Sequence, residues 1–181
     1  MLKLLRETLV VSLCYVTSYS IGAFYPAFMF FGGAFGAESA SLLFLPHGVR
    51  VLTAWLYGYK SVLLLAPASF FTHALRLDGE DLALGFYLGP LVGVVCAAVT
   101  FDVCARLGFD VRLRDDYRAN WRGVFVVGAL SSVINSVGTN IAFGDDLKVM
   151  IAYWVGDVGG LFAALVILMF LFRALRKFAN S

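Results

Sequence analysis

The stretch LPHGVRVLTAWLYG, residues 45–58, places a proline, a histidine and an arginine among apolar side chains. The whole chain has 181 residues, of which 61% are hydrophobic and 14% are charged. Soluble domains are roughly half apolar and roughly a quarter charged. The composition therefore predicts an integral membrane protein. The ionisable residues of 45–58 then require an explanation, because a charged side chain in hydrocarbon is costly.

The distribution of apolar residues predicts an all-α fold, a polytopic bundle of six transmembrane helices that forms one domain over residues 1–181. A helix needs about 20 mostly apolar residues to cross the hydrocarbon core. The first such segment is too long for a signal peptide, and we interpret it as an uncleaved span. The segments that meet or approach the required length are about 8–31, 40–58, 61–76, 82–106, 123–143 and 148–172.

Charge asymmetry predicts that both termini of the six-span bundle lie in the cytoplasm. In this arrangement, the cytoplasmic ends hold all of the 14 Lys and Arg residues except Arg50, Arg76 and Lys148. Acidic residues collect instead in the outer loops, so the topology follows the positive-inside rule. The formal net charge of +2 is too small to indicate a nucleic-acid partner.

Arg50 and Asp157 are predicted to lie at matching depths near the middle of the membrane. Each follows the outer end of its span by about ten residues, which is about 15 Å at the helical rise. Either charge alone would cost several kcal/mol at the bilayer centre. We therefore expect a direct Arg50–Asp157 pair.

Other polar residues are predicted to lie near this level. His47 precedes Arg50 by one helical turn on the same face, and two asparagines fall in the outer half of the 123–143 segment. The candidate polar site consists of His47, Arg50, Asn135, Asn140 and Asp157. It could bind a ligand or ion, relay protons through His47, or serve only as interhelical contacts.

Pro46 and Gly48 are expected to bend or break the second span just above Arg50, because proline removes a backbone donor and glycine relaxes the turn. At the other end of the bundle, Asp102 and Arg106 have the i, i+4 spacing of a local salt bridge. The segment FDVRLRDDYRANWRG, residues 109–123, mixes basic, acidic and aromatic residues. It is typical of an interfacial segment on anionic headgroups, or it could form a docking surface.

The motifs of hydrolytic, metal and redox enzymes are missing from the sequence. The two histidines are far apart, and the three cysteines, Cys14, Cys96 and Cys104, lie in apolar segments without a C-x-x-C spacing. Neither a Walker loop nor a G-x-S-x-G motif occurs. We therefore expect no enzymatic activity, no cofactor and no metal.

Two stretches resemble the signature of the bacterial membrane-associated sensor domains (MASE-type) that precede histidine kinases and diguanylate cyclases. In LPHGVRVLTAWLYGYKSVLLLAPASFF, the opening motif is matched by Leu45, Pro46, Gly48, Gly58 and Lys60. The closing Trp-x-Gly/Ala-Asp-x-x-Gly motif is matched by Trp154, Gly156, Asp157 and Gly160. The resemblance covers roughly residues 40–172. The family usually has about eight spans, however, and this sequence contains no kinase or cyclase.

The resemblance implies a stand-alone, sensor-like module of the bacterial inner membrane. Such a module would bind a small ligand or a membrane-protein partner, and its signal would pass to another polypeptide. We also expect a stable assembly with another membrane protein or as a homo-oligomer. Two other functions remain open at this point. The chain could be a small-solute transporter or a substrate-binding transporter subunit, or an accessory structural subunit of a larger membrane complex.

Overall fold

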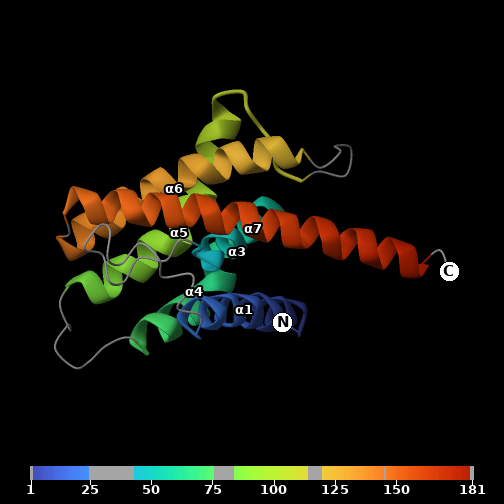
Figure 1. Ribbon diagram of the computed structural model, residues 1–181, viewed down its shortest axis with the longest axis horizontal. Coiled ribbons are helices and arrows are strands. Elements are labelled where there is room, and N and C mark those ends of the chain that lie inside the picture. Colours follow the sequence, from blue (N-terminus) through green and yellow to red (C-terminus); the bar gives the residue numbers. More distant parts are fainter. Residues whose placement is uncertain (1, 25–42, 76–83, 114–119, 145, 180–181) are drawn as a thin grey trace.

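The computed structural model describes residues 2–24, 43–75, 84–113, 120–144 and 146–179. Every regular element within these ranges is a helix, which confirms the predicted all-α fold (Figure 1). The helices are α1 (Leu2–Phe24), α3 (Leu45–Tyr57), α4 (Lys60–Ala74), α5 (Leu84–Arg106), α6 (Trp121–Phe143) and α7 (Leu147–Ala179).

Three of the described helices, and not six, are long and apolar enough to cross a membrane. These stretches are Tyr87–Arg106 in α5, Trp121–Phe143 in α6 and Leu147–Phe178 in α7. The second and third expected spans correspond to α3 and α4, which have only 13 and 15 residues. At the helical rise they are about 20 and 22 Å long, shorter than the hydrocarbon core of roughly 30 Å. Parts of the first, second and fourth expected spans, residues 25–31, 40–42 and 82–83, lie outside the described residues.

Helix α3 is the centre of the bundle, and it packs against each of the other five described helices. Figure 1 shows it between α7 on one side and α4 and α1 on the other. Val51 and Ala54 of α3 are fully buried in an apolar cluster that also contains Phe101 of α5 and Leu161 of α7. A second apolar cluster, around Tyr15, joins α1 to α4 and α5.

Pro46 does not bend a continuous helix, because α3 begins beside it. Leu43 and Phe44 are not helical, and Pro46 lies in the first turn of α3. A proline is well tolerated there because the first backbone N–H groups of a helix have no intrahelical acceptor. The bend expected above Arg50 is thus a helix start, and it directs both His47 and Arg50 into the interior.

Small residues allow the start of α3 to pack closely on α7. The Phe44 amide donates to the Gly156 carbonyl of α7 at 2.9 Å. A Cβ atom added to Gly48 would clash with the Ala164 methyl group, and one added to Gly160 would clash with the backbone of Phe44. Gly48 therefore allows close packing of α3 on α7, whereas the sequence analysis expected it to relax the helical turn.

A turn at Gly58 and Tyr59 separates α3 from α4. Gly58 has a φ of 56°, in the left-handed region that favours glycine, and its amide closes α3 by donating to the Ala54 carbonyl at 2.8 Å. Gly58, four positions after Ala54, therefore specifies the end of α3.

Polar contacts fix the segment that follows α5. The predicted Asp102–Arg106 salt bridge is confirmed, with Arg106 Nε 2.7 Å from Asp102 Oδ2. Arg112 Nε donates to Asp110 Oδ1 at 2.9 Å, and this hydrogen bond raises the pKa of Arg112 above its ordinary value. The Trp55 indole of α3 donates to the Val111 carbonyl at 2.8 Å. Residues 114–119, which contain most of the charges predicted to contact headgroups or a partner, lie outside the described residues.

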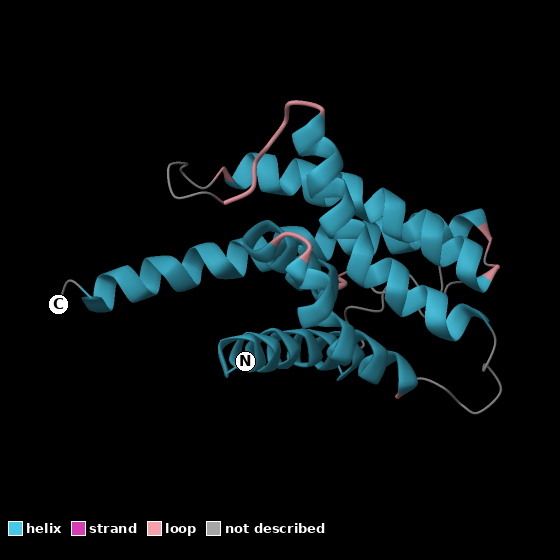
Figure 2. Cartoon of the chain, turned by 180° about the vertical axis from the view of Figure 1, so that it is seen from behind, coloured by secondary structure: helices cyan, strands magenta, loops and turns pink. Residues whose placement is uncertain are grey.

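The C-terminal half of α7 projects beyond the other helices (Figure 2). Its apolar side chains are exposed in the isolated chain, for example Phe170 at 58% and Phe178 at 78%. Basic residues occur in its last turns, including Arg176 and Lys177. This half of α7 therefore offers apolar side chains to lipid or to another helix, and its end carries positive charge.

Candidate functional site

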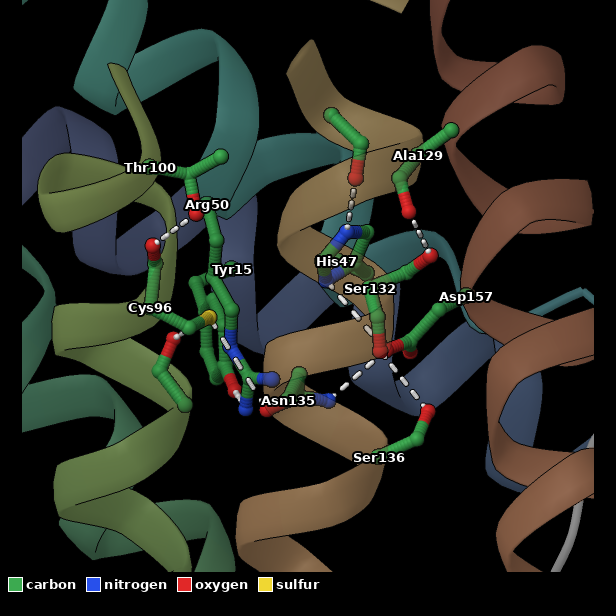
Figure 3. Close-up of polar contacts among 12 residues, drawn as sticks. Tyr15, His47, Arg50, Cys96, Thr100, Ala129, Ser132, Asn135, Ser136 and Asp157 are labelled. Carbon is green, nitrogen blue, oxygen red and sulfur yellow. Dashed lines mark hydrogen bonds and ion pairs between the residues drawn. The ribbon is translucent and has the colours of Figure 1, made fainter. Parts of the chain in front are cut away.

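Polar side chains from three helices meet in the interior of the bundle. His47 on α3 is 0% exposed, Asp157 on α7 is 2% exposed and Asn135 on α6 is 6% exposed. Asp157 Oδ2 lies 3.4 Å from His47 Nδ1 and accepts a hydrogen bond of 2.7 Å from Asn135 Nδ2 (Figure 3). We refer to these three residues, together with Arg50 and Tyr15, as the polar cluster.

The second ring nitrogen of His47 contacts the backbone of α6. His47 Nε2 lies 3.2 Å from the Gly128 carbonyl oxygen. A Cβ atom added to Gly128 would clash with the Leu161 side chain and would lie 2.9 Å from Val51 Cγ1. The glycine thus allows α6 to approach α3 and α7 closely enough for its carbonyl to reach the imidazole.

Arg50 turns toward α1 and α5. Its guanidinium donates to the Tyr15 hydroxyl, and its Cζ lies 5.4 Å from the centre of the Tyr15 ring and 5.5 Å from that of Phe44. A Cβ atom on Gly93 of α5 would lie 2.7 Å from Arg50 Cζ, so the guanidinium rests against bare backbone. Aromatic faces attract a cation more strongly when it is desolvated, as Arg50 is here.

The expected direct contact between Arg50 and Asp157 is not formed, and the partner predicted for Asp157 was wrong. Among the described residues, the ionisable group close to Asp157 Oδ2 is His47 Nδ1, at 3.4 Å, and not the guanidinium of Arg50. Figure 3 shows the Asn135 side chain between the Arg50 guanidinium and the Asp157 carboxylate. The two opposite charges still attract each other through the interior, where Coulomb interactions are weakly screened. Asn135 therefore connects the two charged groups without a direct salt bridge.

Asn140, the fifth residue of the predicted site, lies apart from the polar cluster. It is five positions after Asn135, near the end of α6, and its amide donates to the backbone carbonyl of Asp146 at 3.3 Å. This contact connects the C-terminal end of α6 to the residue before α7. The structure therefore places Asn140 at the α6–α7 connection, whereas it brings His47, Asn135 and Asp157 together.

Two participants were missed by the sequence analysis. Tyr15 supplies the acceptor for Arg50, and Cys96 of α5 lies with its Sγ 3.9 Å from Asn135 Oδ1. Both occur inside apolar segments, where a tyrosine and a cysteine are unremarkable core residues. Their part in the site depends on how α1 and α5 pack around α3, and no local pattern in the sequence specifies that packing.

Not every buried polar atom here has a partner. Within the described ranges, His47 Nδ1, Arg50 Nε and Ser131 Oγ make no hydrogen bond. Native interiors leave few such atoms, so each one calls for a physical reason. The same ranges hold no cluster of three His, Cys, Asp or Glu side chains that could bind a metal ion.

Comparison with known proteins adds no assignment for this site. The sequence resemblance noted above rests on motif residues alone. Of these, Asp157 belongs to the polar cluster, Pro46 lies in the first turn of α3, and Gly48, Gly156 and Gly160 lie at the α3–α7 contact. A function is therefore inferred from the geometry of the polar cluster. The chain matches no protein-family model, no curated protein and no solved structure.

Proposed function

We propose that this chain is a sensor-like module of the bacterial inner membrane, which responds to a ligand at the polar cluster and acts on a membrane-protein partner. The observation that carries the proposal is the burial of Arg50, His47 and Asp157 in one cluster at the centre of an apolar helical bundle. Burying an ionisable group in an apolar interior costs free energy, and in membrane proteins such groups mark functional sites by default.

The incomplete hydrogen bonding of the polar cluster favours a responsive site over a purely structural one. A set of contacts that only joined helices would be expected to satisfy its buried polar atoms. His47 Nδ1 and Arg50 Nε instead make no hydrogen bond among the described residues. Because α3 contacts every other described helix, a shift of α3 caused by a change at His47 would act on all of these helices.

We further propose six membrane crossings with both termini in the cytoplasm. The start of α1 and the end of α7 point to the same side of the bundle, which supports this topology (Figure 1). The positions of the basic residues support it as well. Helices α3 and α4 would each cover about two thirds of the hydrocarbon core, so non-helical flanking residues such as Leu43 and Phe44 would lie at membrane depth. Such backbone is tolerated where protein buries it, as the Phe44–Gly156 hydrogen bond does here.

Cysteine accessibility tests the topology. Leu107, just after α5, and Leu147, at the start of α7, are both exposed and should lie on opposite sides of the membrane. Leu107→Cys and Leu147→Cys are made in a Cys14→Ala background, since Cys14 is exposed. A membrane-impermeant maleimide should label position 147 in intact spheroplasts and position 107 only after lysis. Labelling of both positions from the same side would rule out the six-span topology.

Cross-linking tests the proposed signalling role. A photoreactive amino acid at Phe170 or Phe178 on the projecting half of α7 should capture a membrane protein with an output domain, such as a kinase or cyclase. The same probe at Phe101, which is buried in the core, is the control. Capture of a transporter ATPase would instead indicate a transporter subunit. Cross-links to lipid alone would contradict the proposal of a partner on α7.

A further inference from the structure

The hydrogen bond of His47 with α6 determines which ring nitrogen carries a proton. A backbone carbonyl oxygen can only accept a hydrogen bond, so the 3.2 Å contact with Gly128 requires a proton on His47 Nε2. In a neutral imidazole, the other nitrogen is then a bare acceptor. The tautomer of His47 is thus set by a backbone group of α6.

This tautomer makes the contact between His47 and Asp157 incomplete. The bare Nδ1 of a neutral His47 faces the Asp157 carboxylate, and an ionised carboxylate also only accepts hydrogen bonds. The two atoms are 3.4 Å apart, beyond the 2.7–3.2 Å typical of a hydrogen bond, and Nδ1 makes no hydrogen bond among the described residues. One additional proton between them would convert two facing acceptors into a charge-assisted hydrogen bond.

The balance of charges around His47 allows one additional proton to bind. The charged groups that act on His47 are Asp157 on α7 and Arg50 on α3, and Arg50 in turn lies beside Tyr15 on α1 and Cys96 on α5. The groups that α6 contributes, the Gly128 carbonyl and the Asn135 amide, are neutral. The charge of Arg50 balances that of Asp157, so the cluster is neutral without the extra proton and carries one positive charge with it.

We propose that the ligand of the polar cluster is a proton, which binds reversibly between His47 Nδ1 and Asp157 Oδ2. The proton comes from a hydronium ion, whose O–H bond breaks to leave water as an N–H bond forms at the Nδ1 lone pair. Its binding draws Nδ1 and Oδ2 into hydrogen-bond distance and tightens the contact between α3 and α7. This deepens the proposed function, because it names the stimulus of the sensor as the proton concentration.

Nitrogen NMR of the full chain in lipid nanodiscs tests this assignment. The protein has two histidines, and a His73→Gln variant with ¹⁵N-labelled histidine isolates the signal of His47. At high pH, we expect a neutral ring protonated on Nε2. On acidification, both nitrogens should become protonated, and the signal of the Asp157 carboxyl carbon should shift over the same pH range. In Asp157→Asn, the imidazolium population at the acidic end should fall several-fold.

The NMR signals of His47 and Asp157 in the protein with both residues intact test the proposal even if Asp157→Asn fails to fold. A single protonation state of His47 from about pH 4.5 to 9, whether neutral or charged, would overturn it. So would a neutral ring that carries its proton on Nδ1. If His47 titrates but no partner is captured on α7, the proton site stands and the proposed signalling role fails. A captured output protein with a non-titrating His47 gives the reverse result.

Discussion

His47 on α3 and Asp157 on α7 face each other inside the bundle, with Nδ1 and Oδ2 3.4 Å apart. The two helices also meet through the Phe44–Gly156 backbone hydrogen bond. The central helix of the bundle is therefore joined to its longest helix by a polar contact that sits beside a tightly packed backbone crossing. A change in the protonation or position of either side chain would act directly on the α3–α7 contact.

The Tyr15 hydroxyl should stabilise the fold through Arg50. Tyr15→Phe removes the acceptor of a buried guanidinium hydrogen bond, and leaving such a donor unpaired costs about 1–3 kcal/mol. The aromatic ring that faces the guanidinium is retained. We expect a loss of this size in reversible unfolding measured in lipid–detergent bicelles.

Tyr57→Phe provides the matched control for this variant, because Tyr57 is partly buried against the same apolar cluster. We expect this control to change the free energy of unfolding by less than about 0.5 kcal/mol, as is usual away from buried polar contacts. Equal losses in the two variants would show that the Tyr15 hydroxyl has no special role in holding Arg50.

Gly160 should be far less tolerant of a methyl group than Gly138. A Cβ on Gly160 would meet the carbonyl group of Phe44 and lie 2.7 Å from the Leu45 nitrogen, which is backbone. The atoms nearest to a Cβ on Gly138 belong to the Val92 side chain, with Cγ1 at 2.6 Å. Because backbone yields less readily than a side-chain end, Gly160→Ala should lower the thermal midpoint clearly more than Gly138→Ala. A larger loss in Gly138→Ala would contradict the described α3–α7 crossing.

Trp55 should hold the segment that follows α5 in place. Its indole donates to the Val111 carbonyl, and its ring centre lies 5.4 Å from that of Trp121. Trp55→Phe removes the donor, so we expect trypsin to cleave at Arg112 several-fold faster in detergent solution. Trp154→Phe changes an exposed tryptophan and is the control. Unchanged cleavage in Trp55→Phe would show that the hydrogen bond does not restrain the segment.

The sequence was sufficient to predict the fold class and the Asp102–Arg106 pair. Long apolar segments and an i, i+4 spacing are local signals, and local signals depend little on tertiary packing. The partners of Arg50 and Asp157, in contrast, were predicted wrongly. Their equal depth predicted a direct pair, but depth says nothing about the direction in which a side chain points around its helix. Asn135 occupies the space between the two charges, and Arg50 turns instead to Tyr15.

The helical extent of the second span and the role of Pro46 were predicted less well, for a related reason. A hydropathy window counts apolar residues whether or not they are helical, so it extended the second span across Leu43 and Phe44, which are not helical. Proline is compatible with a kink or with a first helical turn, and the packing of Phe44 on Gly156 accompanies the second outcome. Contacts between distant segments thus determined what the local pattern left open.

A double-mutant cycle between His47 and Asp157 tests the central claim most directly. Asp157→Ala should destabilise the bundle by about 3–5 kcal/mol, since it leaves the charge of Arg50 buried without its counter-charge. We expect His47→Leu and Asp157→Ala to be coupled by about 1–2 kcal/mol in bicelle unfolding, at the upper end of interhelical polar interactions. Asn140→Ala, which alters the amide near the end of α6, should combine with Asp157→Ala additively to within about 0.5 kcal/mol. Additivity of the His47 and Asp157 variants to within that same margin would contradict a polar cluster built on this pair.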